Sequence, residues 1–389
     1  MSGPGVAAAA QPDAWSAYLR GLEALGRRVL RDDFPSDPAG RDDCFRHLGQ
    51  QVLCWLEWSI GYGDPAAPAF QRQNDAITPW GGPNADNVYR HARVAPGHRY
   101  RIRGRTNSCE DFALAVRAGF RHTATPATLK ELTASDVGIG RDQSFELVLG
   151  GAGREPNHVP LPDGAVMCSI REYYFDWSPS EPATFTIEHV GGPAAGQPEL
   201  PGGLAEALDL TERSLVFWND YMRDARARQE DNSFGNKIDV PRGLQLSQFG
   251  FCFYDLGPDE ALVVECDVPD ARYWSFQLYG MHFFRPFDLG RTTSLNHRQA
   301  HVAADGSVHL VAAHSDPGVV NWLDTTGRAL GLVNYRHFWG SRMPELRTRV
   351  VPLADVRAAL PPHTPAVSAS ARSREVAARR AHLAWRFRT

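Results

Sequence analysis

The stretch DGSVHLV (residues 305–311) has a close counterpart earlier in the chain, DQSFELV (residues 142–148). In both, Asp-x-Ser opens a short segment whose residues are typical of a β-strand. The interval to the next shared residue, an asparagine, is 15 residues in the first copy and 16 in the second, and from there to a shared arginine it is 14 and 15. These anchors are Asn157 and Arg171 in the first copy and Asn321 and Arg336 in the second. Their order and spacing indicate an internal duplication.

A further shared motif, Pro-x-x-Arg-Tyr, precedes the two copies at residues 96–100 and 269–273. From its tyrosine to the Asp-x-Ser aspartate, both included, there are 43 residues in the first copy and 33 in the second. A repeat of about 100 residues is too long for a solenoid unit, so the duplication predicts two β domains. We expect a mainly β fold with helical additions (α+β), made of two tandem related antiparallel β-sandwich or jelly-roll-like modules.

Apolar residues at helical spacing predict three helices, at about residues 13–31, 42–62 and 203–228, and a terminal helix or arm. The expected organisation has five parts. They are a helical N-terminal segment packed on the core (1–68), the first β module (69–195), a connecting helix and polar loop (196–245), the second β module (246–358) and a C-terminal helix or arm (359–389).

Composition restricts the class of protein. The 389 residues carry a formal net charge of −4 without a basic block, which argues against nucleic-acid binding. Six cysteines without a C-x-x-C pair predict reduced thiols and a cytoplasmic location. The N-terminus lacks the basic start of a signal peptide, and no apolar run approaches the roughly 20 residues of a membrane span. The sequence leaves homo-oligomer formation open.

The second copy resembles a known family of bacterial proteins, grouped as domain of unknown function 1214. The strings that carry this resemblance are SQFGFCFYDLGPDEALVVECDVPDARYWSFQLY (residues 247–279) and DPGVVNWLDT (residues 316–325). The first copy is similar to the upstream region of the same proteins, as in IREYYFDW (residues 170–177), so the resemblance spans about residues 70–358. Where Asn-Trp is expected in the first copy, this chain has Asn157-His158. The resemblance implies a fold but no activity.

Two polar segments contain candidate catalytic residues. In HSDPGVVNWLDTTG (residues 314–327), His314 and Asp324 could form an acid/base pair beside Trp322, with Asn321 as a ligand contact. The alternative is that the asparagine and the aspartate cap turns through the local backbone. In NADNVYRH (residues 84–91), the candidate catalytic residue is Asp86, and the candidate substrate contacts are Asn87 and Tyr89. Strand termination is the alternative for this second segment.

An arginine beside aromatic residues points to an anion partner. Strand alternation in IREYYFDW places Arg171, Tyr173 and Trp177 on one face, and a buried guanidinium requires a counter-charge. That charge is either a structural carboxylate or a substrate carboxylate or phosphate. Because Arg336 repeats the arrangement, the structural alternative is favoured. Tyr273 and Trp274 complete the predicted aromatic walls of a binding cleft.

Three histidines offer an alternative metal site. HRQAHVAADGSVHLVAAH (residues 297–314) reads as a hairpin about Asp305-Gly306, which would place His297 opposite His314 and His301 on the same strand face. Imidazoles in this arrangement could hold Zn, Fe or Mn, although a one-residue bulge would break the set.

The chain contains no G-x-S-x-G motif, no P-loop and no G-x-G-x-x-G in a strand–helix context. We therefore expect a cofactor-independent acid/base enzyme, an isomerase, lyase or hydrolase, that acts on a small and largely apolar molecule in an aromatic-lined cleft. Two alternatives remain open: a non-catalytic protein that binds a small molecule or a carbohydrate, and a metalloenzyme with histidine ligands.

Overall fold

The structure is a computed structural model that describes residues 4–153, 155, 157–178, 181–192, 199–235, 238–239 and 247–388. The boundaries expected near residues 195 and 245 lie outside the described residues. The chain forms two compact units. Unit 1 comprises Met1–Gly81, Val88–Tyr173 and Glu181–Asp220, and unit 2 comprises Gly82–Asn87, Tyr174–Ser180 and Tyr221–Thr389. Two short segments from the first half of the sequence therefore belong to the second unit, which the sequence did not lead us to expect.

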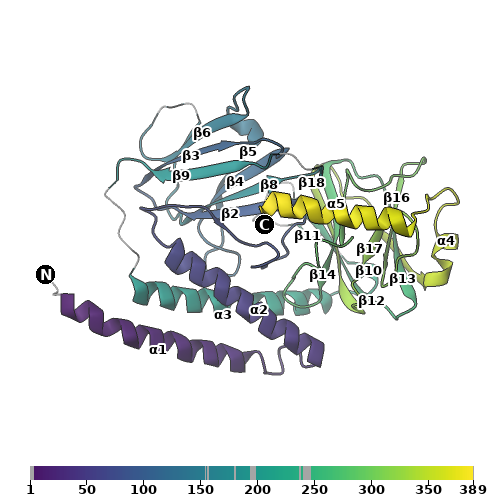
Figure 1. Ribbon diagram of the computed structural model, residues 1–389, viewed down its shortest axis with the longest axis horizontal. Helices are drawn as coiled ribbons and strands as arrows, with labels where there is room; N and C mark the ends of the chain where they lie inside the picture. Colours follow the sequence, from purple (N-terminus) through teal and green to yellow (C-terminus); the bar gives the residue numbers. More distant parts are fainter. Residues whose placement is uncertain are drawn as a thin grey trace. The chain divides into compact units, whose positions relative to one another are not determined.

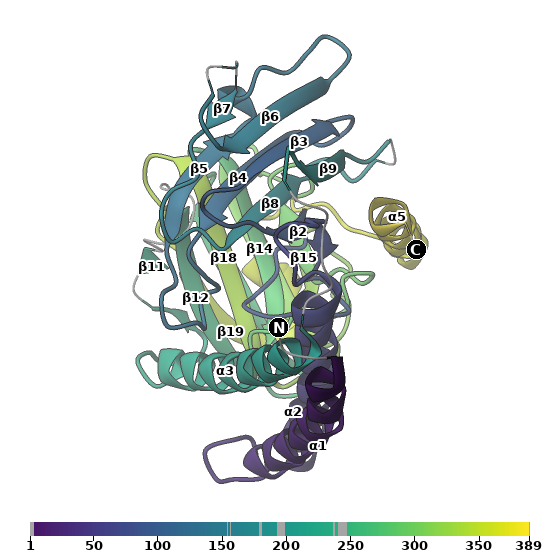
Figure 2. The same cartoon turned by 90° about the vertical axis from the view of Figure 1, so that its left-hand side faces the viewer.

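The first β module contains two sheets, which Figures 1 and 2 show from two directions. One has the order β1-β2-β8-β4-β5 and the other the order β7-β6-β3-β9. The strands are β1 (Gln71–Arg72), β2 (Asn87–Arg93), β3 (Arg99–Arg105), β4 (Asp111–Arg117), β5 (Thr128–Thr133), β6 (Ser144–Gly150), β7 (His158–Val159), β8 (Met167–Tyr173) and β9 (Thr184–His189).

The second β module repeats this topology. Its sheets have the orders β10-β12-β18-β14-β15 and β17-β16-β13-β19, and β11 also pairs with β12. The strands are β10 (Ser233–Phe234), β11 (Ile238–Asp239), β12 (Ser247–Asp255), β13 (Glu260–Asp267), β14 (Ala271–Gly280), β15 (Ser294–Asn296), β16 (Ser307–Ala313), β17 (Trp322–Asp324), β18 (Leu330–Gly340) and β19 (Arg347–Pro352). Strands β2 to β9 and β12 to β19 thus occupy equivalent places in their sheets, which confirms the expected tandem modules.

The strand register shows which repeat anchors are equivalent. Asp142 and Asp305 each accept hydrogen bonds from the backbone N–H and hydroxyl of the serine two residues later. Asn157 and Asn321 both adopt a left-handed backbone, with φ of 62° and 57°. The Pro-x-x-Arg-Tyr anchor was a wrong match, because it leads into β3 in the first module but into β14, the counterpart of β4, in the second. Its unequal interval to the aspartate follows from this difference.

The helices lie outside the sheets. They are α1 (Pro4–Arg28), α2 (Pro38–Leu56), α3 (Leu200–Arg226), α4 (Val356–Ala359) and α5 (Ala369–Phe387), and a π-helical turn, η1 (Glu57–Gly61), extends α2. Asp37 caps α2 by accepting a hydrogen bond from the N–H of Gly40 at 2.9 Å. Tyr18 of α1 packs with Leu204 and Ala207 of α3. Helices α1, α2 and α3 lie beside one another in Figure 1.

Alternation along the central strands decides which side chains enter each sandwich core. In the first module, Phe112 of β4 packs against Phe145 of β6 at a ring distance of 5.2 Å. In the second, Trp274, Phe276 and Leu278 of β14 all join the core. The residues between them in β4 and β14 therefore lie on the opposite face of the sheet, away from the partner sheet, and this face carries the polar chemistry of both modules.

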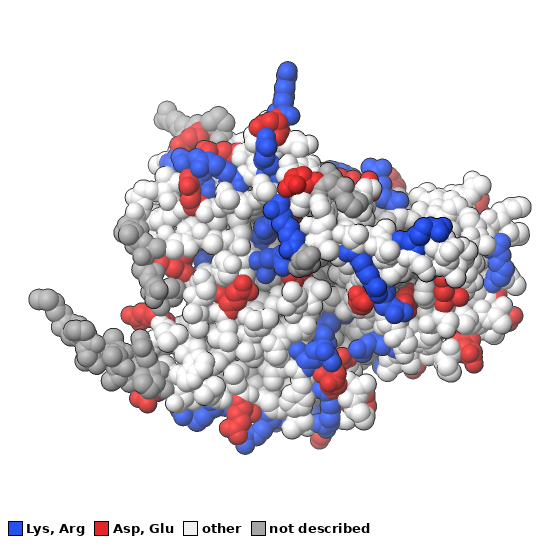
Figure 3. Space-filling model, viewed as in Figure 1, with Lys and Arg blue, Asp and Glu red and all other residues white. Residues whose placement is uncertain are grey.

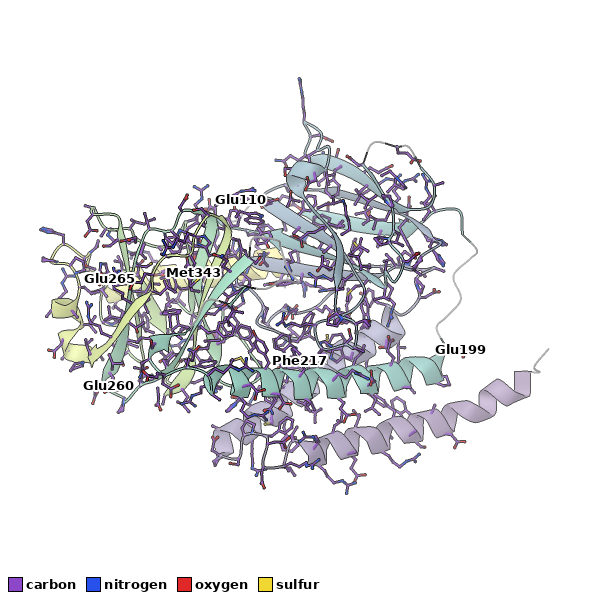
Figure 4. The ribbon with its side chains drawn as sticks, turned by 180° about the vertical axis from the view of Figure 1, so that it is seen from behind. Glu110, Glu199, Phe217, Glu260, Glu265 and Met343 are labelled. Carbon is purple, nitrogen blue, oxygen red and sulfur yellow. The ribbon has the colours of Figure 1, made fainter. Side chains whose placement is uncertain are left out.

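The surface carries both signs of charge. Basic and acidic side chains are intermixed over the face shown in Figure 3. Strand β13, on which Figure 4 labels Glu260 and Glu265, illustrates this pattern, since Glu265 pairs with Arg347 of β19 at 2.9 Å. Among the described residues, none of the helices is both long and apolar enough to cross a membrane.

Candidate functional site

The outer face of the first module brings two arginines together. In the β4–β8 ladder, Ala113 lies opposite Arg171 and Ala115 lies opposite Ser169. Arg117, at the end of β4, reaches back to donate a hydrogen bond from Nε to the hydroxyl of Ser169 at 3.1 Å. Ala113 and Ala115, whose side chains are short, therefore share this sheet face with the two arginines.

Glu131 completes the group, which we call the arginine cluster: Arg117, Glu131, Ser169 and Arg171. In the β4–β5 ladder, Glu131 lies opposite Ala115, so it shares the face of the arginines. Its Oε2 atom is buried and accepts no hydrogen bond from any residue that the structure describes. Arg171 lies with its guanidinium carbon 5.9 Å from the ring centre of Tyr89 on β2.

The arginines of the cluster differ from the other arginines of this module. On neighbouring strands, Arg90 binds Glu172 at 2.5 Å and Arg93 binds Glu206 at 2.5 Å. Arg103 pairs with carboxylates on both adjoining strands. Within the described part of the chain, neither Arg117 nor Arg171 has a carboxylate within 4.0 Å, although both are half-buried. Burying a cation in this way is unfavourable unless an anion compensates it.

The ionisation of nearby groups reports a positive local potential. Burial and the charge of Arg171 lower the pKa of Arg117 to about 9. Burial, reinforced by both arginines, holds the pKa of His91 well below its ordinary value, so this imidazole is neutral. Burial raises the pKa of Glu131, and the two arginines only partly offset that effect. The cluster can therefore attract an anion and offers a carboxyl group that exchanges protons closer to neutral pH than a surface glutamate.

Three predicted substrate contacts, Tyr89, Arg171 and Tyr173, gather at this face. Tyr173 follows Arg171 by two residues on β8, and burial raises the pKa of its phenol while the arginine charge opposes the rise. We did not predict Arg117 and Glu131 from the sequence. They reach the cluster through antiparallel pairing of β4 with β8 and β5, and no local motif marks such pairing.

Asp86, predicted as catalytic, lies in unit 2 at the centre of a buried hydrogen-bond network. Its Oδ2 accepts from the Tyr273 hydroxyl at 2.6 Å, and its Oδ1 accepts from Trp177 Nε1 at 2.8 Å and Asn296 Nδ2 at 2.7 Å. The side chain of Asn84 meets the same hydroxyl at 2.8 Å. Burial and Asp86 raise the pKa of Tyr273 far above its ordinary value, so the phenol stays protonated. Every polar atom named here has a protein partner, which is the pattern of a structural network.

Asn87 and Trp274, both predicted as ligand contacts, are also buried in unit 2. The N–H of Asn87 donates to the carbonyl of Asn84 at 3.1 Å, closing a turn directly before β2. Trp274 belongs to the sandwich core, on the opposite face of β14 from Tyr273. It packs edge-on against Phe276 at a ring distance of 6.1 Å.

The hairpin that suggested a metal site does not form. Ser294–Asn296 forms β15 and pairs with β14, whereas β16 begins only at Ser307 and pairs with β13 and β17 in the other sheet. His297 therefore does not face His314 across a strand pair. It lies edge-on to Phe175 and Tyr273, at ring distances of 5.1 and 5.8 Å. Among the described residues, no three histidine, cysteine or acidic side chains are placed to hold a metal ion.

His314 and Asp324 lie on adjacent strand ends but have separate partners. His314 contacts the hydroxyl of Thr325 through Nδ1 at 2.6 Å and the carbonyl of Leu256 through Nε2 at 3.3 Å. Asp324 binds Arg291 at 2.5 Å and caps its own turn by accepting from the N–H of Thr326 at 2.8 Å. These contacts match the turn-capping alternative rather than an acid/base pair.

Asn321 and Trp322 have structural contacts as well. Asn321 Nδ2 donates to the carbonyls of His301 and His309, and its Oδ1 accepts from the N–H of His301 at 2.8 Å. Trp322 is buried with Val311 and Val356, and its Nε1 donates to the carbonyl of Ala313 at 3.2 Å. These side chains hold β16, β17 and the preceding loop together.

Comparison with known proteins supports the fold and the family. Residues 257–339 match the model of the family described as Protein of unknown function (DUF1214). A crystal structure of an uncharacterized protein from Burkholderia cenocepacia is similar, with a TM-score of 0.82 and 28% identity, over 91% of this chain and 99% of that chain. The VPA0106 protein from Vibrio parahaemolyticus matches less well, with a TM-score of 0.45 and 12% identity over 79% of this chain and 97% of that chain. A search of curated proteins gave no match.

The family match extends from just before β13 almost to the end of β18, and so includes the DPGVVNWLDT string on which the resemblance was based. It is confined to the second module, whereas the arginine cluster belongs to the first. The similarity to the Burkholderia structure covers nearly the whole chain. The chain therefore carries a DUF1214 domain at residues 257–339.

Proposed function

We propose that this protein is an acid/base enzyme, an isomerase, lyase or hydrolase, whose substrate is a small carboxylate with an apolar body. The observation that carries this proposal is the pair of half-buried arginines, Arg117 and Arg171, which form no ion pair within 4.0 Å among the described residues and share one nearby carboxyl group, Glu131. Two guanidinium groups near one anion provide the charge-assisted, planar recognition for which arginine is suited.

A carboxylate fits the cluster better than a phosphate does. Glu131 on the same face would repel the second charge of a dianion, and Lys130, its neighbour on β5, lies opposite Val116 and therefore on the other face of the sheet. The apolar body is inferred from the surroundings of the arginines. Ala113 and Ala115 present only methyl groups on this sheet face, the ring centre of Tyr89 lies 5.9 Å from the guanidinium carbon of Arg171, and Tyr173 follows Arg171 on β8.

Glu131 is the proposed proton donor and acceptor. A general acid or base acts best when its pKa approaches the working pH, and burial raises the pKa of this carboxyl group. Its buried Oε2 atom makes no hydrogen bond within the described part of the structure, so that atom is available to a substrate proton. Asp86, by contrast, already accepts three hydrogen bonds from protein side chains.

Binding can be tested by calorimetric titration of the purified chain with phenylacetate and with its neutral analogue phenylacetamide. We expect phenylacetate to bind and Arg171→Gln to weaken it by about 10- to 100-fold, since a hydrogen bond to a charged group contributes about 1.5–3 kcal/mol. The amide should bind weakly to both proteins. Arg103→Gln, which removes an ion-paired surface arginine of the same module, is the matched control and should leave binding unchanged. Equal phenylacetate affinities for the original chain and Arg171→Gln would refute the proposed site.

Catalysis can be tested separately with a panel of carboxylic acids, followed by liquid chromatography and mass spectrometry. We expect at least one acid to be converted by the original chain and left unchanged by Glu131→Gln, which should retain binding. If acids bind at the arginines but none is converted, the protein is the non-catalytic small-molecule binder of the alternative interpretation.

A further inference from the structure

A groove of about 730 Å³ lies within unit 1, away from the arginines of β4 and β8. Side chains from α1, α2, the π-helical turn η1, β1 and the loop after β1 line it. They are Trp15, Leu53, Leu56, Glu57, Ile60, Gly61, Tyr62, Phe70, Arg72, Asp75, Ile77 and Thr78. Its volume falls within the range of sites for small organic molecules.

The groove collects apolar side chains that the fold has not buried. Among the large apolar residues with described side chains, the two most exposed are Ile77 at 53% and Leu53 at 51%, and both line the groove. Trp15, at 49%, lies on the same surface. Leu53 is on α2, whose other face is buried through Cys54 and Trp55. Exposed apolar residues that gather in one concave place are typical of a binding surface, whereas isolated ones need no explanation.

The π-helical turn shapes one wall of the groove. The N–H of Tyr62 donates to the carbonyl of Glu57 at 3.0 Å, five residues back, instead of making the usual bond four residues back. The extra residue places Glu57, Ile60 and Gly61 together in the lining. Such turns are uncommon in helices and are often found at functional sites.

Charge at the rim indicates the kind of ligand that fits. Arg72 and Asp75 are paired with each other at 3.3 Å, and Asp75 also accepts from the N–H groups of Ile77 and Thr78. Glu57 is solvent-exposed, and its Oε2 accepts a hydrogen bond from the neutral amide of Gln71 at 2.9 Å. No cation among the described residues lies within ion-pair distance of Glu57, so the rim has an excess negative charge at this end.

We propose that this groove is a second binding site, for a small amphiphile whose apolar body lies against Trp15, Leu53 and Ile77 and whose ammonium group lies at Glu57. This ligand class is opposite in charge to the one proposed for the arginine cluster. The two sites share no residue, so either proposal can fail without the other.

The test uses dodecylammonium and dodecanoate, which share one chain and differ in the sign of the head group, both below their micelle concentrations. Titrations are performed on the full chain carrying Arg171→Gln, so that dodecanoate cannot bind at the arginine cluster. We expect dodecylammonium to bind about two- to fivefold more tightly, as one exposed ion pair allows, and Glu57→Gln to remove this preference. Leu53→Asn should weaken both probes by about fivefold or more, since it removes apolar contact area.

Val268→Asn is the matched control, because Val268 is 47% exposed but lies in the second module. It should leave both affinities unchanged. The proposal is overturned if Leu53→Asn binds the probes as tightly as the parent chain, or if dodecanoate is preferred. Native mass spectrometry gives a third decisive result. A dimer that disappears in Leu53→Asn would show that the groove is a self-association surface and would also overturn the proposal.

Discussion

The two β modules share one strand order, but the side chains on their outer sheet faces have different hydrogen-bond partners. In the second module, the chain itself covers this face with the segment Gly82–Asn87, which belongs to the same compact unit. Gln277 donates to the carbonyl of Pro83 at 3.1 Å and accepts from the N–H of Ala85 at 2.9 Å. Tyr279 donates to the same Pro83 carbonyl at 2.8 Å, so the β14 side chains are satisfied by backbone atoms.

Two equivalent arginines, Arg171 on β8 and Arg336 on β18, show this difference most clearly. Arg336 of β18 lies opposite Ser275 in β14, as Arg171 of β8 lies opposite Ala113 in β4. Arg336 donates to the carbonyl of Gly82 and to the hydroxyl of Tyr279, both at 2.6 Å. Arg171 has no such acceptor among the described residues. Because the register is the same, the two arginines occupy equivalent places in their sheets but differ in their hydrogen-bond acceptors.

This register also identifies which positions changed. Gln277 and Tyr279 correspond to Ala115 and Arg117, since each pair lies opposite equivalent residues of the neighbouring strand. Groups that hold a peptide segment in the second module are thus replaced by one methyl group and a second cation in the first. The duplicated arginine suggested an architectural role for both copies from the sequence, and Arg336 has the contacts of such a role.

The largest expected effect comes from removing each arginine in turn. Arg336→Gln should destabilise the fold by about 2–4 kcal/mol, because it leaves buried acceptors unpaired and removes packing against Phe249. Arg171→Gln should change stability by less than about 0.5 kcal/mol, because it removes both the repulsion with Arg117 and the attraction to Glu131. Urea denaturation of the two variants, followed by tryptophan fluorescence, measures both values. A comparable loss for both would mean that Arg171 has a structural role like its counterpart.

The asparagines of the two modules give a smaller contrast. Asn321 is buried and makes three side-chain hydrogen bonds, whereas Asn157 makes two, to the N–H of Gly138 and the carbonyl of Glu146. Both need a left-handed backbone, which alanine adopts at a cost. We expect Asn321→Ala to cost about 2–3 kcal/mol and Asn157→Ala about 1–2 kcal/mol in unfolding free energy, measured by the same denaturation. The reverse order would show that burial is not what distinguishes them.

Local chemistry explains which sequence predictions succeeded. The Asp-x-Ser start and the left-handed asparagine are short-range features that depend on neighbouring residues, so their spacing identified equivalent positions in both modules. The Pro-x-x-Arg-Tyr motif only marks the approach to a strand, so it matched two different strands. The predicted hairpin does not form, because Ser294–Asn296 pairs with β14 whereas β16 pairs with β13 in the other sheet. Such pairing depends on residues that are distant in the sequence.

The arginine cluster could be predicted only in part for a related reason. Arg171 was recognisable because an arginine alternates with aromatic residues on its own strand. Arg117 and Glu131 are about 40 to 54 residues away in the chain and meet it through pairing with β4, whose register fixes which side chains share a face. The buried network around Asp86 depends on contacts of the same long-range kind, such as the hydroxyl of Tyr273.

The smallest expected effect concerns the pH dependence of the first module. Because burial raises the pKa of Glu131 above its ordinary value of 4.5, the folded protein binds this proton more tightly than the unfolded chain does. The ionised carboxyl group therefore costs stability above the folded pKa, and the cost disappears as the pH falls through it. Glu131→Gln should therefore raise the unfolding free energy at pH 7 by less than about 1 kcal/mol, and with it the melting temperature. Near pH 4 the substitution should leave the melting temperature unchanged. Phenylacetate should also bind more tightly as the pH falls from 7 to 5, since protonating Glu131 removes the only negative charge of the cluster. Calorimetry at the two pH values tests this, and an equal pH dependence in Glu131→Gln would assign the titration to another group.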